Sequence, residues 1–109
     1  MVKYDEVKIS KSDRDKKYKA VLYLDGDKKM KAELRGDKVK KTLHFGAKGM
    51  SDFTINKDPK RKANYIARHK VNENWKVPDT AGSLSRWILW NKTSFNESVK
   101  DYKRRFKLK

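Results

Sequence analysis

Two histidines and three carboxylates are the side chains of this sequence whose types suggest catalytic or metal chemistry. They are His44, His69, Asp52, Asp58 and Glu73. A metal-dependent nuclease would hold such residues at ligand spacing, as in a His-x-x-His pair or a tight acidic cluster. The sequence has neither pattern and contains no cysteine. We therefore predict a protein that is not an enzyme, with no catalytic residue, metal or cofactor.

A pair of glycines marks a second stretch that suggests chemistry, between Thr42 and Phe53. Gly46 and Gly49 favour a backbone conformation closed to other residues, or a close approach by a partner. The pattern Gly46-x-x-Gly49 lacks the Gly-Lys-Ser/Thr ending of a phosphate-binding loop and does not match a dinucleotide fingerprint. We therefore do not expect nucleotide hydrolysis.

Basic side chains gather on both sides of these glycines. Lysine and arginine beside exposed backbone N–H groups suit phosphate oxygens, and a helix that begins after Asp58 would add positive potential. An exposed tryptophan near them would stack on a base. The predicted nucleic-acid-binding residues are Lys38, Lys40, Lys41, Lys48, Lys57, Lys60, Arg61, Lys62, Arg68, Lys70 and Trp75. The alternatives are a tight turn beside a solvated basic face, and a Trp75 that anchors its own loop.

The net charge favours a polyanion as the partner. The 109 residues include 30 Lys/Arg and 14 Asp/Glu, a formal net charge of +16. Residues 38–72 hold 10 of the basic and 2 of the acidic residues, which is half of the excess. Nucleic acid is the commonest polyanion, so we expect binding to its phosphates with little sequence specificity. We expect DNA rather than RNA as the partner, although the charge itself does not distinguish the two. A lysine-rich solvated surface is the alternative.

The length and the composition indicate one domain that is not secreted. A chain of 109 residues suits a single core, and three Trp, five Tyr and four Phe can fill it. The absence of cysteine excludes disulfides. No apolar run reaches membrane-spanning length, and the N-terminus lacks a signal-peptide core, so we expect no membrane partner.

Residues 1–45 predict an antiparallel meander of four strands. Apolar and polar residues alternate, or apolar residues dominate, over about 3–10, 18–24, 29–35 and 39–45. Asp25-Gly26-Asp27 and Gly36-Asp37 predict tight turns. Lys41 has the parity of Leu43 and Phe45 on the core face, which indicates an edge strand or a strand end. The other face of the sheet is expected to be wet.

Residues 58–109 predict three helices, reached through a junction loop at 46–57. Asp58 as N-cap and Pro59 open the first helix, which runs to about Lys70. Asp79 or Thr80 caps the second, to about Asn91, and a Ser94–Glu97 capping box opens the third. The apolar side of the first helix is predicted at Ala63, Ile66 and Ala67, and the later two helices bring Trp87, Ile88, Val99, Tyr102 and Phe106 to the core. The prediction is a single α+β domain, 1–109, with three helices packed on one face of the sheet.

A family resemblance is carried by several motifs. They are Lys41-Thr42-Leu43-His44-Phe45-Gly46-Ala47-Lys48-Gly49-Met50-Ser51-Asp52-Phe53-Thr54, then Lys57-Asp58-Pro59-Lys60-Arg61-Lys62, Asn72-Glu73-Asn74-Trp75 and Ser85-Arg86-Trp87-Ile88-Leu89-Trp90. They resemble a family of small basic proteins from nucleocytoplasmic large DNA viruses, relatives of the chlorella and giant amoebal viruses. The resemblance covers about residues 38–106 and is less distinct over 1–37. It implies a viral protein in the virion, the host nucleus or the host cytoplasm, and it carries no assigned activity.

Two main hypotheses of function follow. The first is a non-enzymatic protein that binds nucleic acid through its middle segment. The second is a structural component of the virion that contacts capsid or other virion proteins, with loop aromatics such as Trp75 in the interface. A third is a nuclease accessory that needs His44 for cleavage. The sequence indicates no oligomeric state.

Overall fold

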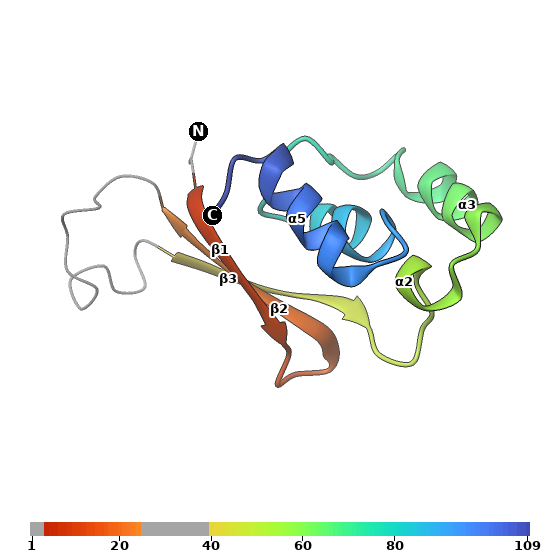
Figure 1. The fold of residues 1–109 in the computed structure, drawn as a ribbon. Coiled ribbons are helices and arrows are strands. Elements are labelled where there is room, and N and C mark those ends of the chain that lie inside the picture. The colour runs from red at the N-terminus through yellow and green to blue at the C-terminus, as the bar shows by residue number, and fades with distance from the viewer. Residues whose placement is uncertain (1–3, 25–39) are drawn as a thin grey trace.

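The fold is a three-stranded antiparallel sheet followed by helices (Figure 1). The computed structural model describes residues 4–24 and 40–109. The strands are β1 (Tyr4–Lys11), β2 (Lys16–Leu24) and β3 (Lys40–Ala47). The helices are α2 (Phe53–Asn56), α3 (Pro59–His69), α4 (Ala81–Leu84), the π-helix η2 (Ser85–Leu89) and α5 (Phe95–Arg105). The predicted α+β class is confirmed.

The order of strands in the predicted meander is wrong. β2 pairs directly with β3 in antiparallel orientation, with Tyr18 opposite Phe45 and Leu22 opposite Lys41. In a four-stranded meander this last strand would lie beside residues 29–35 and run parallel to β2. A long apolar strand can pair along both edges, and β2 does so in the order β1-β2-β3. The predicted strand 29–35 and both tight turns, at 25–27 and 36–37, lie outside the described residues.

The alternation of apolar and polar residues predicted the two faces of the sheet correctly. Val7, Leu22 and Phe45 are buried on the face that meets the helices. Lys8 and Thr42 are exposed on the opposite face, so the predicted wet face is confirmed. In the described part of the sheet β3 is an edge strand, as Lys41 indicated.

The predicted helix starts are confirmed by their caps. In each case the side-chain oxygen of the cap accepts a hydrogen bond from a backbone N–H of the first turn: Asp58 for α3, Thr80 for α4 and Ser94 for α5. The junction loop 46–57 was predicted without helix, and this is wrong. β3 extends to Ala47, and Asp52 caps the single turn of α2. A helix of four residues is too short to show a period in the sequence.

The predicted second helix is not α-helical throughout. The N–H of Trp90 donates to the carbonyl of Ser85 at 3.0 Å, five residues back, as in a π-helix. The wider turn brings Leu84, Ile88 and Leu89 together, and all three are buried. The predicted stripe therefore missed Leu89, because it assumed the spacing of an α-helix.

The predicted core holds for the later helices. Ile88 and Tyr102 are fully buried, and three other predicted core residues, Trp87, Val99 and Phe106, are partly buried against them. The prediction that all three helices pack on the sheet is wrong for α3. Figure 1 shows α3 beyond the end of the sheet, next to α2. It has too few apolar residues to cover a sheet face.

Candidate nucleic-acid interface

Helix α3 has an inward and an outward side, and the inward side agrees with the prediction only at Ile66. Ala63 and Ala67 are exposed. The buried and half-buried residues recur at helical spacing and are Lys62, Tyr65, Ile66 and His69. Lysine and histidine have long or flat apolar parts that can pack while a polar atom finds a partner. A count of apolar residues alone could not find this side.

Stacked rings anchor α3 to the end of η2. The ring of Tyr65 lies 4.5 Å from that of Trp90, nearly parallel at 7°, and 4.2 Å from that of His69. Nδ1 of His69 is 2.7 Å from a carboxylate oxygen of Glu73. Burial, with the nearby charge of Glu73, raises the pKa of Tyr65 to about 12. The phenol is therefore neutral at physiological pH, and this stack fixes which side of α3 faces solvent.

Lys62 is one predicted binding residue that acts inside the fold. Its Nζ donates to the carbonyl of Asn91 at 2.7 Å and lies 5.0 Å from the ring centroid of Phe53. Burial, followed by the charges of Arg86 and Lys92, lowers the pKa of Lys62. Its geometry is that of a lysine that holds α3 to the chain after η2.

The carboxylates near α3 also act inside the fold. Asp52 is 2% exposed and accepts a hydrogen bond from Nζ of Lys17 at 2.6 Å. Asp58 caps α3. Glu73 accepts a hydrogen bond from Nε1 of Trp75 at 2.8 Å. Each of these three carboxylates is hydrogen-bonded within the fold, and none of them forms an ion pair with Lys60, Arg61 or Arg68.

Six of the predicted binding residues are exposed around α2 and α3, and we call them the α3 basic surface. They are Lys48, Lys57, Lys60, Arg61, Arg68 and Lys70. None of them forms an ion pair with a carboxylate of residues 4–24 or 40–109. The backbone N–H groups of Lys60 and Arg61 already donate to Asp58, so the helix start itself offers no free donors there. The side chains carry the positive charge of this surface.

Lys41, another predicted binding residue, lies away from the α3 basic surface. Lys38 is outside the described residues, and Lys40 is described only by its backbone, at the start of β3. Lys41 bonds the carbonyl of Asp79 at 3.0 Å. At about 3.4 Å per strand residue, Lys41 lies about 20 Å from Ala47, the last residue of β3 before the turn that leads to α2.

Trp75 anchors its own loop in this structure. The ring is half-buried, its Nε1 donates to Glu73, and the guanidinium of Arg86 lies 5.4 Å from the ring centroid. Its carbonyl accepts a hydrogen bond from Nε1 of Trp87 at 2.9 Å. These contacts join the loop after α3 to the π-helix.

We expect replacement of Trp75 with alanine to lower stability and to leave duplex DNA binding unchanged. The loss of the half-buried ring and of its bond to Glu73 is expected to cost about 2 kcal/mol. Urea unfolding measures the first effect and fluorescence anisotropy with a labelled duplex the second. Weaker DNA binding at unchanged stability would instead assign base stacking to Trp75.

The two histidines line one pocket of about 460 Å³, together with Asp52 and Glu73. The fold thus brings together four of the five residues that suggested metal chemistry, and Asp58 is not among the lining residues. Each of the four has another partner, and Nδ1 of His44 is 2.7 Å from Oγ of Ser12. In the part of the chain that the structure describes, no group of three His, Cys, Asp or Glu side chains could hold a metal ion.

Comparison with protein families gives one match. Residues 7–69, more than half of the chain, match DUF5754, a family of unknown function. The chain belongs to the DUF5754 family. The match runs from β1 to the end of α3 and includes the sheet-to-helix junction. Searches of curated proteins and of solved structures found no match.

The DUF5754 match differs in extent from the resemblance found in the sequence. That resemblance was placed at about 38–106, whereas the match begins in β1 and stops at His69. The first two strands are therefore part of the family pattern, although they were expected to be less distinct.

Among the described residues, no helix is both long enough and apolar enough to cross a membrane.

Proposed function

We propose that this DUF5754 protein binds nucleic acid without catalysis, through phosphate contacts with little sequence specificity. The observation that carries the proposal is the α3 basic surface, where six cations are exposed and none is paired with a carboxylate of the described residues, while Asp52, Asp58 and Glu73 have hydrogen-bond partners within the fold. Exposed lysine and arginine side chains suit backbone phosphates, which carry no sequence information. The resemblance to proteins of large DNA viruses favours DNA over RNA.

We expect duplex binding to weaken steeply with salt. Each neutralised phosphate contributes about 0.9 to the slope of log affinity against log salt, so six contacts give a slope of about −5. Affinity should then fall by about a thousandfold between about 50 and 200 mM salt. Fluorescence anisotropy with short duplexes of unrelated sequence measures the slope and the specificity together. Absence of binding at low ionic strength would refute the proposal.

Two matched triple variants locate the contact. Each variant removes three positive charges. The first is Lys60→Gln/Arg61→Gln/Arg68→Gln, on the α3 basic surface. The second is Lys8→Gln/Lys100→Gln/Lys103→Gln, on β1 and α5, outside that surface. We expect the first variant to reduce the salt slope by about 3 and the second to leave it near the wild-type value. Equal effects would show that binding depends on net charge and not on this surface.

We further propose a viral origin, with the protein carried in the virion or present in the host nucleus or cytoplasm. This rests on the motifs around the sheet-to-helix junction and not on the fold. Mass spectrometry of purified particles tests the packaging. If the protein were found in extracts of infected cells but not in purified particles, the proposal that it is packaged would be wrong. The proposal of nucleic-acid binding would still be tested by the salt titration.

A further inference from the structure

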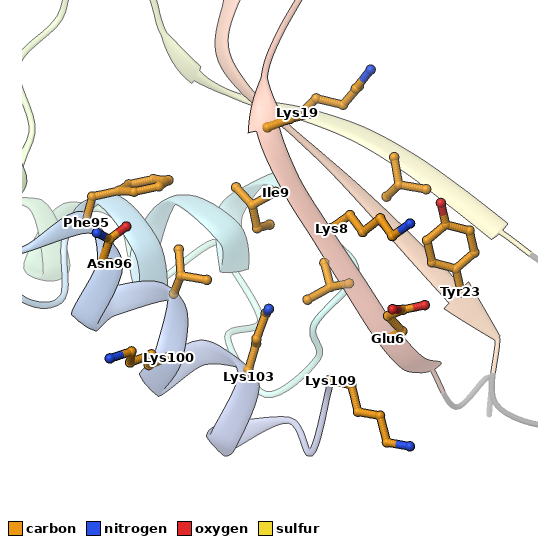
Figure 2. A pocket seen from close by; sticks show the side chains of 14 residues that line it. Glu6, Lys8, Ile9, Lys19, Tyr23, Phe95, Asn96, Lys100, Lys103 and Lys109 are labelled. Atoms are coloured by element: carbon orange, nitrogen blue, oxygen red, sulfur yellow. The ribbon is translucent and has the colours of Figure 1, made fainter.

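A groove of about 880 Å³ separates β1 from α5 and shares no residue with the α3 basic surface (Figure 2). Ile9 of β1 and Phe95 and Val99 of α5 give it apolar walls. Five lysines and one carboxylate, Glu6, also line it. The lysines are Lys8, Lys19, Lys100, Lys103 and Lys109. The groove is thus apolar in its middle and basic around its rim.

One wall of the groove is the edge strand β1. Its neighbour in the sheet is β2, and the N–H of Ser12 donates to the carbonyl of Lys17 at 3.2 Å at the end of this hairpin. Because hydrogen-bonding direction alternates along a strand, the even-numbered residues of β1 bond β2. The N–H and C=O groups of Ile9 and Lys11 therefore point away from the sheet, toward the edge.

The same edge already accepts one residue as an added strand. The N–H of Lys109 donates to the carbonyl of Asp5 at 3.0 Å, and the N–H of Val7 donates to the carbonyl of Lys109 at 3.1 Å. Farther along the edge, Ile9 and Lys11 have no such partner in the described residues. The open part of the edge lies beside the groove.

We propose that this groove binds an extended peptide segment of a partner protein, in which acidic and apolar residues alternate, by strand addition to β1. The backbone of such a segment would exchange hydrogen bonds with Ile9. Alternate side chains of a strand point to opposite faces. The apolar ones would lie against Phe95 and Val99, and the acidic ones would point to the opposite face of the sheet, toward Lys8 and Lys19. Lys100 and Lys103 of α5 would add positive charge beside the apolar ones.

The structure favours a peptide over nucleic acid here for two reasons. A strand edge presents carbonyl oxygens as well as N–H groups, which matches another backbone but repels phosphate. The apolar walls also need side chains to fill them. From Phe95 to Lys103, α5 extends over about 12 Å, which is the length of about four extended residues.

The test uses a fluorescein-labelled peptide of alternating glutamate and valine, with binding followed by anisotropy. The matched triple variants serve again. We expect Lys8→Gln/Lys100→Gln/Lys103→Gln to weaken peptide binding at least about tenfold, because the charge-assisted contact of Lys8 and the positive charges of Lys100 and Lys103 beside the peptide are lost. Lys60→Gln/Arg61→Gln/Arg68→Gln should bind the peptide as the wild type does. None of the six replaced side chains is buried, so both variants should keep the core intact, which circular dichroism verifies.

Backbone methylation separates strand addition from simple charge attraction. Two further peptides carry N-methyl groups on alternate residues, one on the even and one on the odd positions. Methylation should abolish binding only when it blocks the N–H groups that face β1. One of the two peptides should therefore bind and the other should not. Equal binding of the two methylated peptides would overturn the proposal. So would a peptide with all its glutamates in one block and all its valines in another, if it bound as well as the alternating peptide.

Nucleic acid in the groove is the competing outcome. It would show as no peptide binding, together with weaker duplex binding by the Lys8→Gln/Lys100→Gln/Lys103→Gln variant, and it too would overturn the proposal. The failure of DNA binding at the α3 basic surface would leave the peptide result unchanged, because the two sites have different probes and different variants.

Discussion

Replacement of Gly46 with alanine is expected to lower the free energy of unfolding by about 3 kcal/mol, from backbone strain and overpacking together. The φ angle of Gly46 is +84°, in the left-handed region that a side chain disfavours. A Cβ atom there would also lie 2.9 Å from Cδ1 of Leu89 and 3.2 Å from Cβ of Lys17. Leu89 is 2% exposed, so it has no free space into which it can move.

Gly49→Ala is the matched control for this prediction. Its φ of +80° is nearly the same, but nothing lies within 4 Å of the added Cβ atom. We expect a loss of about 1 kcal/mol, from the backbone alone. Urea unfolding of both variants gives the difference. An equal loss in the two would show that β3 and η2 do not approach as closely at Gly46 as the structure has them.

The sequence predicted well whatever depends on neighbours along the chain. Alternation gave the inward residues of the strands, and short polar side chains before helical patterns gave the caps at Asp58, Thr80 and Ser94. The positive φ of Gly46 and Gly49 was likewise expected from residue type. Each of these features is decided by a few residues whose local energy differs strongly between conformations.

The sequence predicted poorly what depends on distant partners. The pairing of β2 with β3 is a choice between two similar strands, and periodicity does not distinguish them. The π-turn at η2 brings Leu89 inward, where it packs closely against Gly46 of β3, far away in the sequence. The inward side of α3 contains Lys62 because its Nζ donates a hydrogen bond to the carbonyl of Asn91, which is 29 positions farther along the chain.

The candidate site was predicted in part for the same reason. Charge counting located the basic residues of α3, but it could not show that Asp52 accepts a hydrogen bond from Lys17 and Glu73 one from Trp75. It also could not find the groove. Lys8, Lys19 and Lys100 are far apart in the sequence, and only the packing of α5 beside β1 brings them to one rim. Surfaces made from separate elements leave no local signal.

Replacement of Asp101 with asparagine is expected to lower the free energy of unfolding at neutral pH by about 2 to 3 kcal/mol, because a buried, paired charge is lost. Asp101 is 6% exposed. One of its oxygens accepts from Nδ2 of Asn91 at 2.7 Å, and both Arg104 and Arg105 pair with it. Since Asn91 also accepts from Lys62, this carboxylate supports the contacts between α5, η2 and α3.

The effect should disappear in acid. Burial alone would raise the pKa of Asp101, but the hydrogen bonds from Asn91 and Arg104 and the charge of Arg105 outweigh it and lower this pKa below the ordinary value of 3.8. A lowered pKa in the folded state means that the carboxylate stabilises the fold above the pKa of an unfolded aspartate. That stabilisation is lost as the pH falls through the folded-state value. Wild type should therefore lose stability below about pH 4, and Asp101→Asn should lose less.

Glu97→Gln is the control, because it removes an exposed carboxylate from the same helix. The side chain of Glu97 is 63% exposed and lies 3.7 Å from Nζ of Lys100. An exposed pair of this kind contributes at most about 0.5 kcal/mol, so its pH profile should follow that of the wild type. Urea unfolding from neutral to acid pH compares the three proteins. If Asp101→Asn and Glu97→Gln gave the same profile, the buried carboxylate would not be what joins α5 to the rest of the helical part.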